Sequence, residues 1–142
     1  MHTGVVFAIL GALAFGLWTV FHQQASTHIH NLFGSIVVSI TAVIVGLVFL
    51  LPNLKSTTLV TNPKGIIFAI LGGICALGID YFALRSYSSG LPISISGPII
   101  IGGSIGIASM IGFFLGEPAT LPKLLSLLLI IIGSALLASQ GN

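Results

Sequence analysis

Charge is what this sequence has least of. Its 142 residues include only four lysines and arginines and two acids, so that charged residues make up 4% of the chain. Soluble domains carry about 25% charged residues, and six charged side chains cannot build a surface that faces water. Hydrophobic residues make up 56%, and the mean hydropathy is +1.21. We therefore expect an integral membrane protein that faces lipid over most of its surface.

The same scarcity excludes several classes of function. A net charge of +2, spread over four basic residues, forms no patch for a phosphate backbone, so we expect no nucleic-acid partner. Cys75 is the only cysteine, which excludes a disulfide within the chain; its apolar run favours a packing role. We find no nucleophile triad, phosphate loop or pair of carboxylates. The sequence therefore predicts neither an enzyme nor a cofactor.

Long apolar runs dominate what is present. A helix needs about 20 residues to cross the hydrocarbon core, and polar or proline-containing breaks separate five runs of about that length. The first run has no preceding lysine or arginine and no convincing cleavage site, so we expect a retained span and not a signal peptide. The prediction is an all-α bundle, a single membrane domain over residues 1–142, with spans at about 3–22, 32–51, 65–84, 92–115 and 121–139.

Small residues mark the faces on which these helices are expected to meet, because close backbone approach favours packing in membranes. Span 5 differs: its segment "LLSLLLIII" (124–132) is bulky all round, so we expect it to be the most lipid-exposed helix, with a contact face near its end. The small-residue faces of the other spans are Gly4, Ala8, Ala12 and Gly16; Ser35, Ser39, Ala42 and Gly46; Gly72, Ala76 and Asp80; and Ser94, Pro98, Gly102 and Gly106.

Orientation follows from the basic residues in the short loops. Lys55, Lys64 and Lys123 fall on the side of the N-terminus, and Arg85 alone falls on the other side. The bias predicts a cytoplasmic N-terminus and an external C-terminus. Its small margin leaves room for copies inserted the other way.

The second half of the chain resembles the EamA-like family of the drug/metabolite transporter superfamily. The segments that carry the resemblance are "YFALRSYSSGLPISISGPIIIGGSIG" (81–106) and "GFFLGEPATLPKLLSLLLIIIGSALLAS" (112–139). They contain, in order, Ala-Leu-Arg at the end of span 3, a small-residue opening of span 4, a proline within it, Gly-Glu at its exit, and a last span with a late glycine.

Many members of that family have ten spans, made of two five-span repeats, and this chain has the length of one. An odd number of spans per repeat gives consecutive copies opposite orientations. The resemblance implies a transporter of small metabolites or drug-like solutes in a bacterial inner membrane. It also implies assembly as a homodimer, possibly inverted, or as a heterodimer with a second five-span chain.

Glu117 stands at the exit of span 4, where an acid is unusual in this chain. Pro118 disfavours helix at the residue before it, Thr120 is a candidate N-cap for span 5, and Pro122 is tolerated in the first turn. An anion beside that helix start is stabilising by about 0.3–1 kcal/mol. A structural role therefore explains Glu117, and the alternative is a role in gating or proton coupling.

Pro98 lies early in span 4 and removes one backbone donor, which leaves the carbonyl of Ser94 short of a partner. Bent helices at membrane depth often line transport cavities. We therefore take Ser94, Pro98 and Gly102 as candidate solute-binding residues. The alternative is a packing kink satisfied by a nearby serine.

Asp80 is the one acid well inside a predicted span, and such a residue is by default a functional candidate. It either lines a polar cavity, where it binds solute or exchanges a proton, or it is paired with Arg85 near the membrane surface. Trp18 and Tyr81 are candidates for stacking on a solute. The alternative for these two aromatic residues is the interfacial belt.

His22, His28 and His30 raise the question of a metal site, but neither cysteine nor acid accompanies them in their loop, so none is predicted. The leading hypothesis is a secondary transporter that works by alternating access as a dimer. The alternative is a non-transporting membrane subunit that assembles with a larger partner. An accessory subunit needs packing faces but no polar cavity, so the proline in span 4 and Asp80 discriminate between them.

Overall fold

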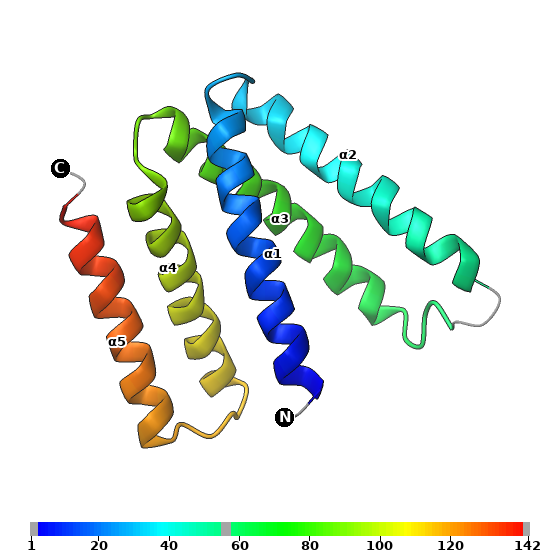
Figure 1. Cartoon of the computed structure of the whole chain (residues 1–142). Coiled ribbons are helices and arrows are strands. Elements are labelled where there is room, and N and C mark those ends of the chain that lie inside the picture. The colour runs from blue at the N-terminus through cyan, green and yellow to red at the C-terminus, as the bar shows by residue number, and fades with distance from the viewer. Residues whose placement is uncertain (1–2, 55–57, 141–142) are drawn as a thin grey trace. The chain divides into compact units, whose positions relative to one another are not determined.

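The computed structural model describes residues 3–54 and 58–140, and within them it contains five α-helices, one 3₁₀ turn and no strand (Figure 1). All five α-helices are long and apolar enough to cross a membrane. The predicted all-helical architecture with five candidate spans is thus confirmed. The elements are α1 (Thr3–Ser26), α2 (Asn31–Leu50), η1 (Leu51–Asn53), α3 (Lys64–Ser88), α4 (Ile93–Phe114) and α5 (Leu121–Ala138).

Two helices run further than their apolar composition indicates. Helix α1 continues to Ser26 and α3 to Ser88, whereas the apolar runs were predicted to end at residues 22 and 84. An apolar run marks the part that hydrocarbon can cover, but a helix ends only where its backbone hydrogen bonds end. Helix α3 stops just before Gly90, whose φ of 91° lies in the left-handed region that favours glycine.

Helix α4 ends at Phe114 in a Schellman motif centred on Gly116, which has a φ of 97°. The backbone N–H of Glu117 donates to the carbonyl of Gly112 at 3.0 Å, and that of Gly116 donates to Phe113 at 3.1 Å. The glycine therefore ends the helix before Pro118 is reached. Thr120 is the N-cap of α5, as predicted, although its side chain makes no capping hydrogen bond.

The helices form two compact units. One contains α4 and α5 with α1 up to Val20, and the other runs from Phe21 to Ser88 and contains the last turns of α1 with α2 and α3. Each unit is described separately below. That the chain is one membrane domain stays a prediction.

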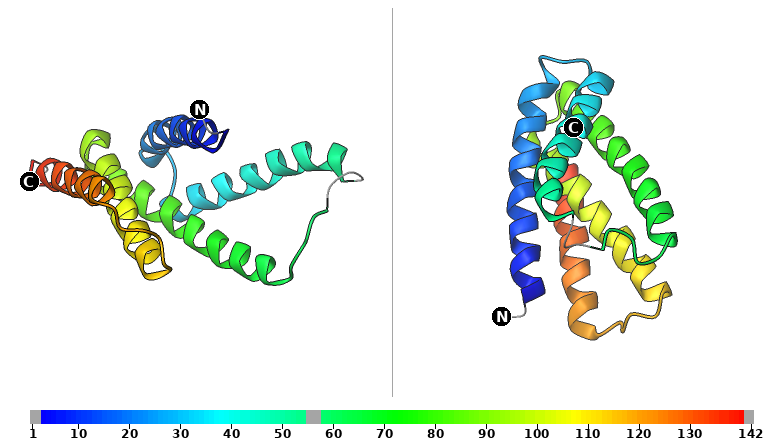
Figure 2. Two further views of the ribbon diagram at one scale, coloured as in Figure 1. Left: turned by 90° about the horizontal axis from the view of Figure 1, so that it is seen from below. Right: turned by 90° about the vertical axis from the view of Figure 1, so that its right-hand side faces the viewer.

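In the first unit, α4 and α5 lie side by side and run antiparallel (Figures 1 and 2). Gly102 of α4 is buried against α5: a Cβ atom there would come within 2.9 Å of the Cβ of Ser134. The hydroxyl of Ser134 donates to the carbonyl oxygen of Pro98 at 3.0 Å. The small residues predicted for span 4 thus include a real contact with the late small residues of span 5.

In the second unit, α2 and α3 are closest near the start of α2 and the end of α3, and they diverge toward the connection that joins them (Figure 2, left). At the close end, a Cβ on Gly34 would lie 2.9 Å from Cδ1 of Leu84. The side-chain amide of Asn31 donates to the Ser88 hydroxyl at 3.0 Å.

The buried residues of this unit gather at the same end. The hydrophobic ones are Ala83, Leu84 and Tyr87, while Ser35 and three other polar residues are equally buried. Elsewhere the large apolar side chains are mostly exposed, as they are at Phe7 and Phe68. An apolar exterior around a small and partly polar interior is the distribution expected of a chain that lipid surrounds. The other three buried polar residues are His22, Ser26 and Asp80.

Candidate polar site between helices α1 and α3

The most unusual contact in the protein joins His22 of α1 to Asp80 of α3. His22 Nε2 lies 3.1 Å from Asp80 Oδ1. The two side chains are 4% and 10% exposed, so both are withdrawn from solvent. Both residues lie in helices long and apolar enough to span a membrane. An acid and a base that are 58 positions apart in the sequence thus meet in a poorly solvated place.

Helix geometry explains why these two residues can meet. His22 lies in the last turns of α1, and Asp80 lies two turns before the end of α3. Asp80 occupies the same face of α3 as Ala83, Leu84 and Tyr87, the residues three, four and seven positions later, all of which are buried. The packing of that face therefore also buries the carboxylate.

Electrostatics makes the pair more than a packing contact. An acid at the centre of a membrane helix costs about 2.5 kcal/mol or more, and such residues generally find a partner or line a polar cavity. The imidazole supplies that partner, and the contact is an ion pair only when His22 is protonated. The charge of the pair therefore depends on one proton.

At the buried end of the second unit, two serine hydroxyls donate hydrogen bonds to backbone carbonyls of their own helices. Ser26 Oγ donates to the carbonyl of Gln23 at 2.7 Å, and Ser35 Oγ donates to the carbonyl of Asn31 at 2.9 Å. Bonds of this i−3 and i−4 kind let a buried serine satisfy its donor locally. The oxygen of each serine keeps acceptor capacity for a proton donor or a solute.

The predicted solute-binding residues fall into the two units. Asp80 and Tyr81 lie on α3; Tyr81 is half-buried and meets Phe82 edge-on, with ring centroids 5.2 Å apart. Trp18 of α1 is half-buried and stacks on Phe15 at 4.9 Å. Arg85 is exposed in the last turn of α3. The binding roles of these residues stay predictions.

Ser94, Pro98 and Gly102 all lie on α4, which continues as a helix from Ile93 to Phe114 through the proline. Pro98 and Gly102 share one contact, the Ser134 side chain. An apolar groove of about 350 Å³ lies along the same contact between α4 and α5, and its lining includes Gly102, Gly106 and Ile131. The geometry around Gly102 is thus that of helix packing beside a groove; a solute-binding role stays a prediction.

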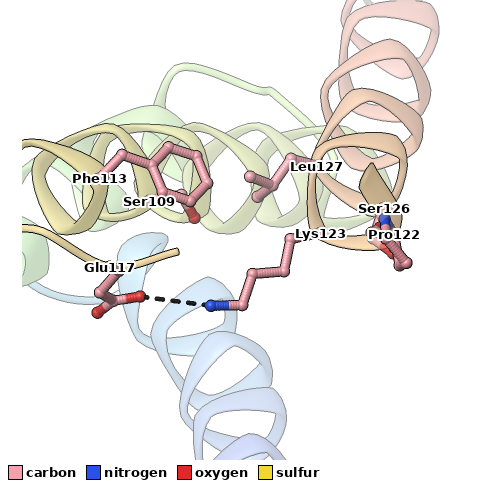
Figure 3. A pocket seen from close by; sticks show the side chains of 7 residues that line it. All are labelled: Ser109, Phe113, Glu117, Pro122, Lys123, Ser126 and Leu127. Atoms are coloured by element: carbon pink, nitrogen blue, oxygen red, sulfur yellow. Dashed lines mark hydrogen bonds and ion pairs between the residues drawn. The ribbon is translucent and has the colours of Figure 1, made fainter. Parts of the chain in front are cut away.

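Glu117 lies at a second hollow, of about 430 Å³, where α4 ends and α5 begins (Figure 3). Its carboxylate is 3.8 Å from Lys123 Nζ and packs beside Gly112. The Glu117 and Lys123 side chains are 64% and 47% exposed, so solvent screens the pair. The hollow is lined by Ser109, Phe113, Glu117, Pro122, Lys123, Ser126 and Leu127.

His22 was not among the residues that the sequence nominated as a partner for Asp80, since it was assigned to a polar loop. The sequence did contain one indication that His22 and Asp80 lie near each other. The predicted spans 1 and 3 cross in the same direction, so residues near the same end of both are expected at similar depth. His22 and Asp80 both fall in the last third of their helices. Matching residues by depth in this way makes His22 one candidate partner for Asp80, but it does not show which helices are neighbours.

A metal centre finds no support in the described residues, where no three side chains of histidine, cysteine, aspartate or glutamate come together. His28 and His30, the other two histidines of the predicted loop, are exposed. A single imidazole and a single carboxylate suit proton chemistry better than they suit a structural metal, which usually takes four ligands.

Comparison with known proteins places the chain in a family. No family model matches it, and no solved structure matches it. The uncharacterized protein MJ1333.1 of Methanocaldococcus jannaschii is 31% identical over 141 residues, which cover 97% of this chain and 98% of that protein. The chain belongs to the same family as this archaeal protein. The likeness extends over all five helices of this chain.

Proposed function

We propose that this protein is a secondary transporter of the EamA-like type, which moves a small metabolite or drug-like solute by alternating access. The observation that carries the proposal is the buried His22–Asp80 pair within helices long and apolar enough to span a membrane. Ionisable residues in such a place are costly, and they typically mark solute or ion pathways. A purely structural helix bundle needs no such pair.

Two further features support this proposal. The proline inside α4 lies beside an apolar groove, an arrangement found where transporters bend and line a cavity. The large apolar side chains are mostly exposed, which leaves much surface for lipid and for a second five-span chain. We propose a dimer, either homomeric and possibly inverted, or heteromeric, because two five-span units build the ten-span members of the family that the sequence resembles.

One observation favours the alternative of a non-transporting subunit. A Cβ added at Gly4, Gly11 or Gly16 of α1 would meet no atom within 4 Å. These glycines leave the surface of α1 open to close approach by a helix of a larger membrane partner. That role needs the glycines but not the His22–Asp80 pair, so substitution of Asp80 separates the two hypotheses.

Uptake by reconstituted protein tests the proposal even though the solute is not specified. Proteoliposomes are incubated with a small-molecule cell extract, filtered, and their contents compared with those of protein-free liposomes by mass spectrometry. We expect at least one solute to accumulate with wild-type protein. Asp80→Asn preserves size and most hydrogen bonding, so we expect it to keep the fold while uptake falls to the level of protein-free liposomes.

Glu117→Gln is the matched control, because it removes the chain's other acid from an exposed position. Melting temperature and elution volume, measured beside uptake, distinguish a lost mechanism from a lost fold. Wild-type uptake in Asp80→Asn removes this residue from the mechanism. If no solute accumulates with folded wild-type protein, the subunit hypothesis takes the place of the transporter.

A further inference from the structure

The His22–Asp80 pair has a property that a pathway lined by hydroxyls lacks: it contains an imidazole, which can bind a proton. Histidine is the side chain whose ordinary titration falls between pH 5 and 8. At 3.1 Å from Asp80 Oδ1, the His22 imidazole is close enough for its charge to change the energy of the carboxylate directly.

Proton balance at this site follows from its two groups. With a neutral imidazole and an ionised carboxylate, the two side chains together carry a charge of −1 in a poorly solvated place. One proton taken from water converts His22 to an imidazolium, and the pair becomes neutral overall. Burial penalises net charge more than it penalises a matched pair, so a single proton decides whether this site carries a net charge.

Few other charges compete for this proton. Helices α2 and α4 carry no titratable side chain, and α1 carries His22 alone. On α3, the phenol of Tyr87 shares the buried face of Asp80, while Tyr81 is half-buried and Arg85 is exposed in the last turn. The nearby loop adds His28 and His30, both exposed; the remaining titratable groups of α3 are Lys64 and Cys75, at least five residues before Asp80.

The pair also links two segments of the chain. His22 belongs to the last turns of α1, and Asp80 belongs to α3, so the imidazolium–carboxylate attraction holds these turns against α3. Loss of the proton to water removes that attraction and leaves a carboxylate facing a neutral ring. One proton can therefore favour one arrangement of these last turns on α3 over another, which is what coupling requires.

We propose that His22 and Asp80 together form a proton-binding site, and that the proton is the coupling ion of this protein. The claim that the proton is the coupling ion rests on the proposed transport function. The claim that the two residues bind a proton does not. The two claims are tested by separate measurements.

Proton binding is read directly by NMR of protein labelled with ¹³C and ¹⁵N on its four histidine rings, in lipid bilayers over a range of pH. His22→Gln identifies the His22 signal by its loss, and His28→Gln is the matched control at an exposed position. We expect wild-type His22 to gain one proton in a single step. In Asp80→Asn we expect the His22 titration curve to differ measurably from that of the wild type, while the His28 curve stays unchanged.

His22→Arg is a control for loss of fold. Its guanidinium keeps a positive charge beside Asp80 but does not release its proton in this pH range. We expect it to retain the helix content of the wild type. A His22 signal that shows no titration, or that titrates identically in Asp80→Asn, overturns the proton site whatever the transport result.

Proton coupling is tested by measuring uptake from the cell extract into proteoliposomes under two conditions. In one a pH gradient is imposed across the membrane, and in the other the pH is equal on both sides. We expect the gradient to change wild-type uptake at least severalfold and to have no effect on any residual uptake by His22→Arg. Equal wild-type uptake under both conditions overturns proton coupling and leaves the proposed transport function standing. Titration without any uptake overturns both the transport function and the coupling, and leaves a proton site of another purpose.

Discussion

Gly102 shows how a single missing side chain sets the distance between two helices. Its place on α4 faces Ser134 of α5, and Ser134 also bonds to the carbonyl of Pro98. A larger residue at 102 would push α5 away and break that bond. Gly103 is the next residue on the same helix, and a Cβ there would meet nothing within 4 Å.

Gly102→Ala is expected to destabilise the protein by about 1–3 kcal/mol, because overpacking forces the helices apart. Gly103→Ala is the matched control. It is expected to be neutral or stabilising by up to about 1 kcal/mol, since alanine favours helix and meets no obstacle. Unfolding in mixed micelles, followed by circular dichroism, compares them. Equal stability of the two variants would contradict the close contact at Gly102.

The identity of the partner of Asp80 shows what residue-level sequence reasoning reached and what it missed. The scarcity of charge was enough to single out Asp80 as a functional candidate. Arg85 was one of the alternatives considered for Asp80, because it is near in sequence, and that pairing stays a prediction; the ion pair that the structure gives joins Asp80 to His22. Such a pairing depends on which helices lie side by side. Depth within the predicted spans narrows the candidates, but it does not show which helices are neighbours.

At the scale of elements, the turn between α4 and α5 depends on its backbone more than on its charges. Gly116 adopts a left-handed conformation that lets the N–H groups of residues 116 and 117 cap α4. The Glu117–Lys123 pair is long, at 3.8 Å, and exposed. Exposed pairs of this kind contribute about 0–1 kcal/mol.

Glu117→Gln is therefore expected to lower the free energy of unfolding by less than about 1 kcal/mol and to leave uptake largely intact. Gly116→Ala is expected to cost more, about 1–2 kcal/mol, because alanine resists the left-handed conformation. Chemical denaturation measured beside uptake tests this order. Normal stability with abolished uptake in Glu117→Gln would instead assign Glu117 to gating.

Element boundaries were the less predictable part of the fold. Apolar runs located all five helices, because hydrocarbon demands about 20 consecutive apolar residues. They did not locate the ends of α1 and α3, which extend through polar residues to Ser26 and Ser88. Those extra turns add Ser26 and Tyr87 to the buried end of the second unit.

At the scale of the whole molecule, the proposed transporter requires a defined orientation in the membrane. The predicted cytoplasmic side carries Lys64 and Lys123, together with Lys55, which lies outside the described residues. The opposite side carries Arg85 alone. Basic residues in short loops favour the cytoplasm. We expect a three-to-one bias to orient most copies and to leave a minority inserted inversely, whereas an inverted homodimer needs equal numbers of both.

We expect the N-terminus and the α2–α3 connection inside, and the C-terminus outside, in most copies. Cysteines placed at Thr58 and Gln140 in a Cys75→Ser background report this, since both positions are exposed in the structure. A membrane-impermeant thiol reagent added to intact cells should label position 140 strongly and position 58 weakly. Lys64→Gln with Lys123→Gln should move the two labelling yields toward equality, because the charge bias then disappears.

Predominant external labelling at position 58 in the wild-type background would reverse the assigned orientation. Equal labelling there would instead indicate dual insertion as the normal state, and would favour the inverted homodimer over a heterodimer with a second five-span chain.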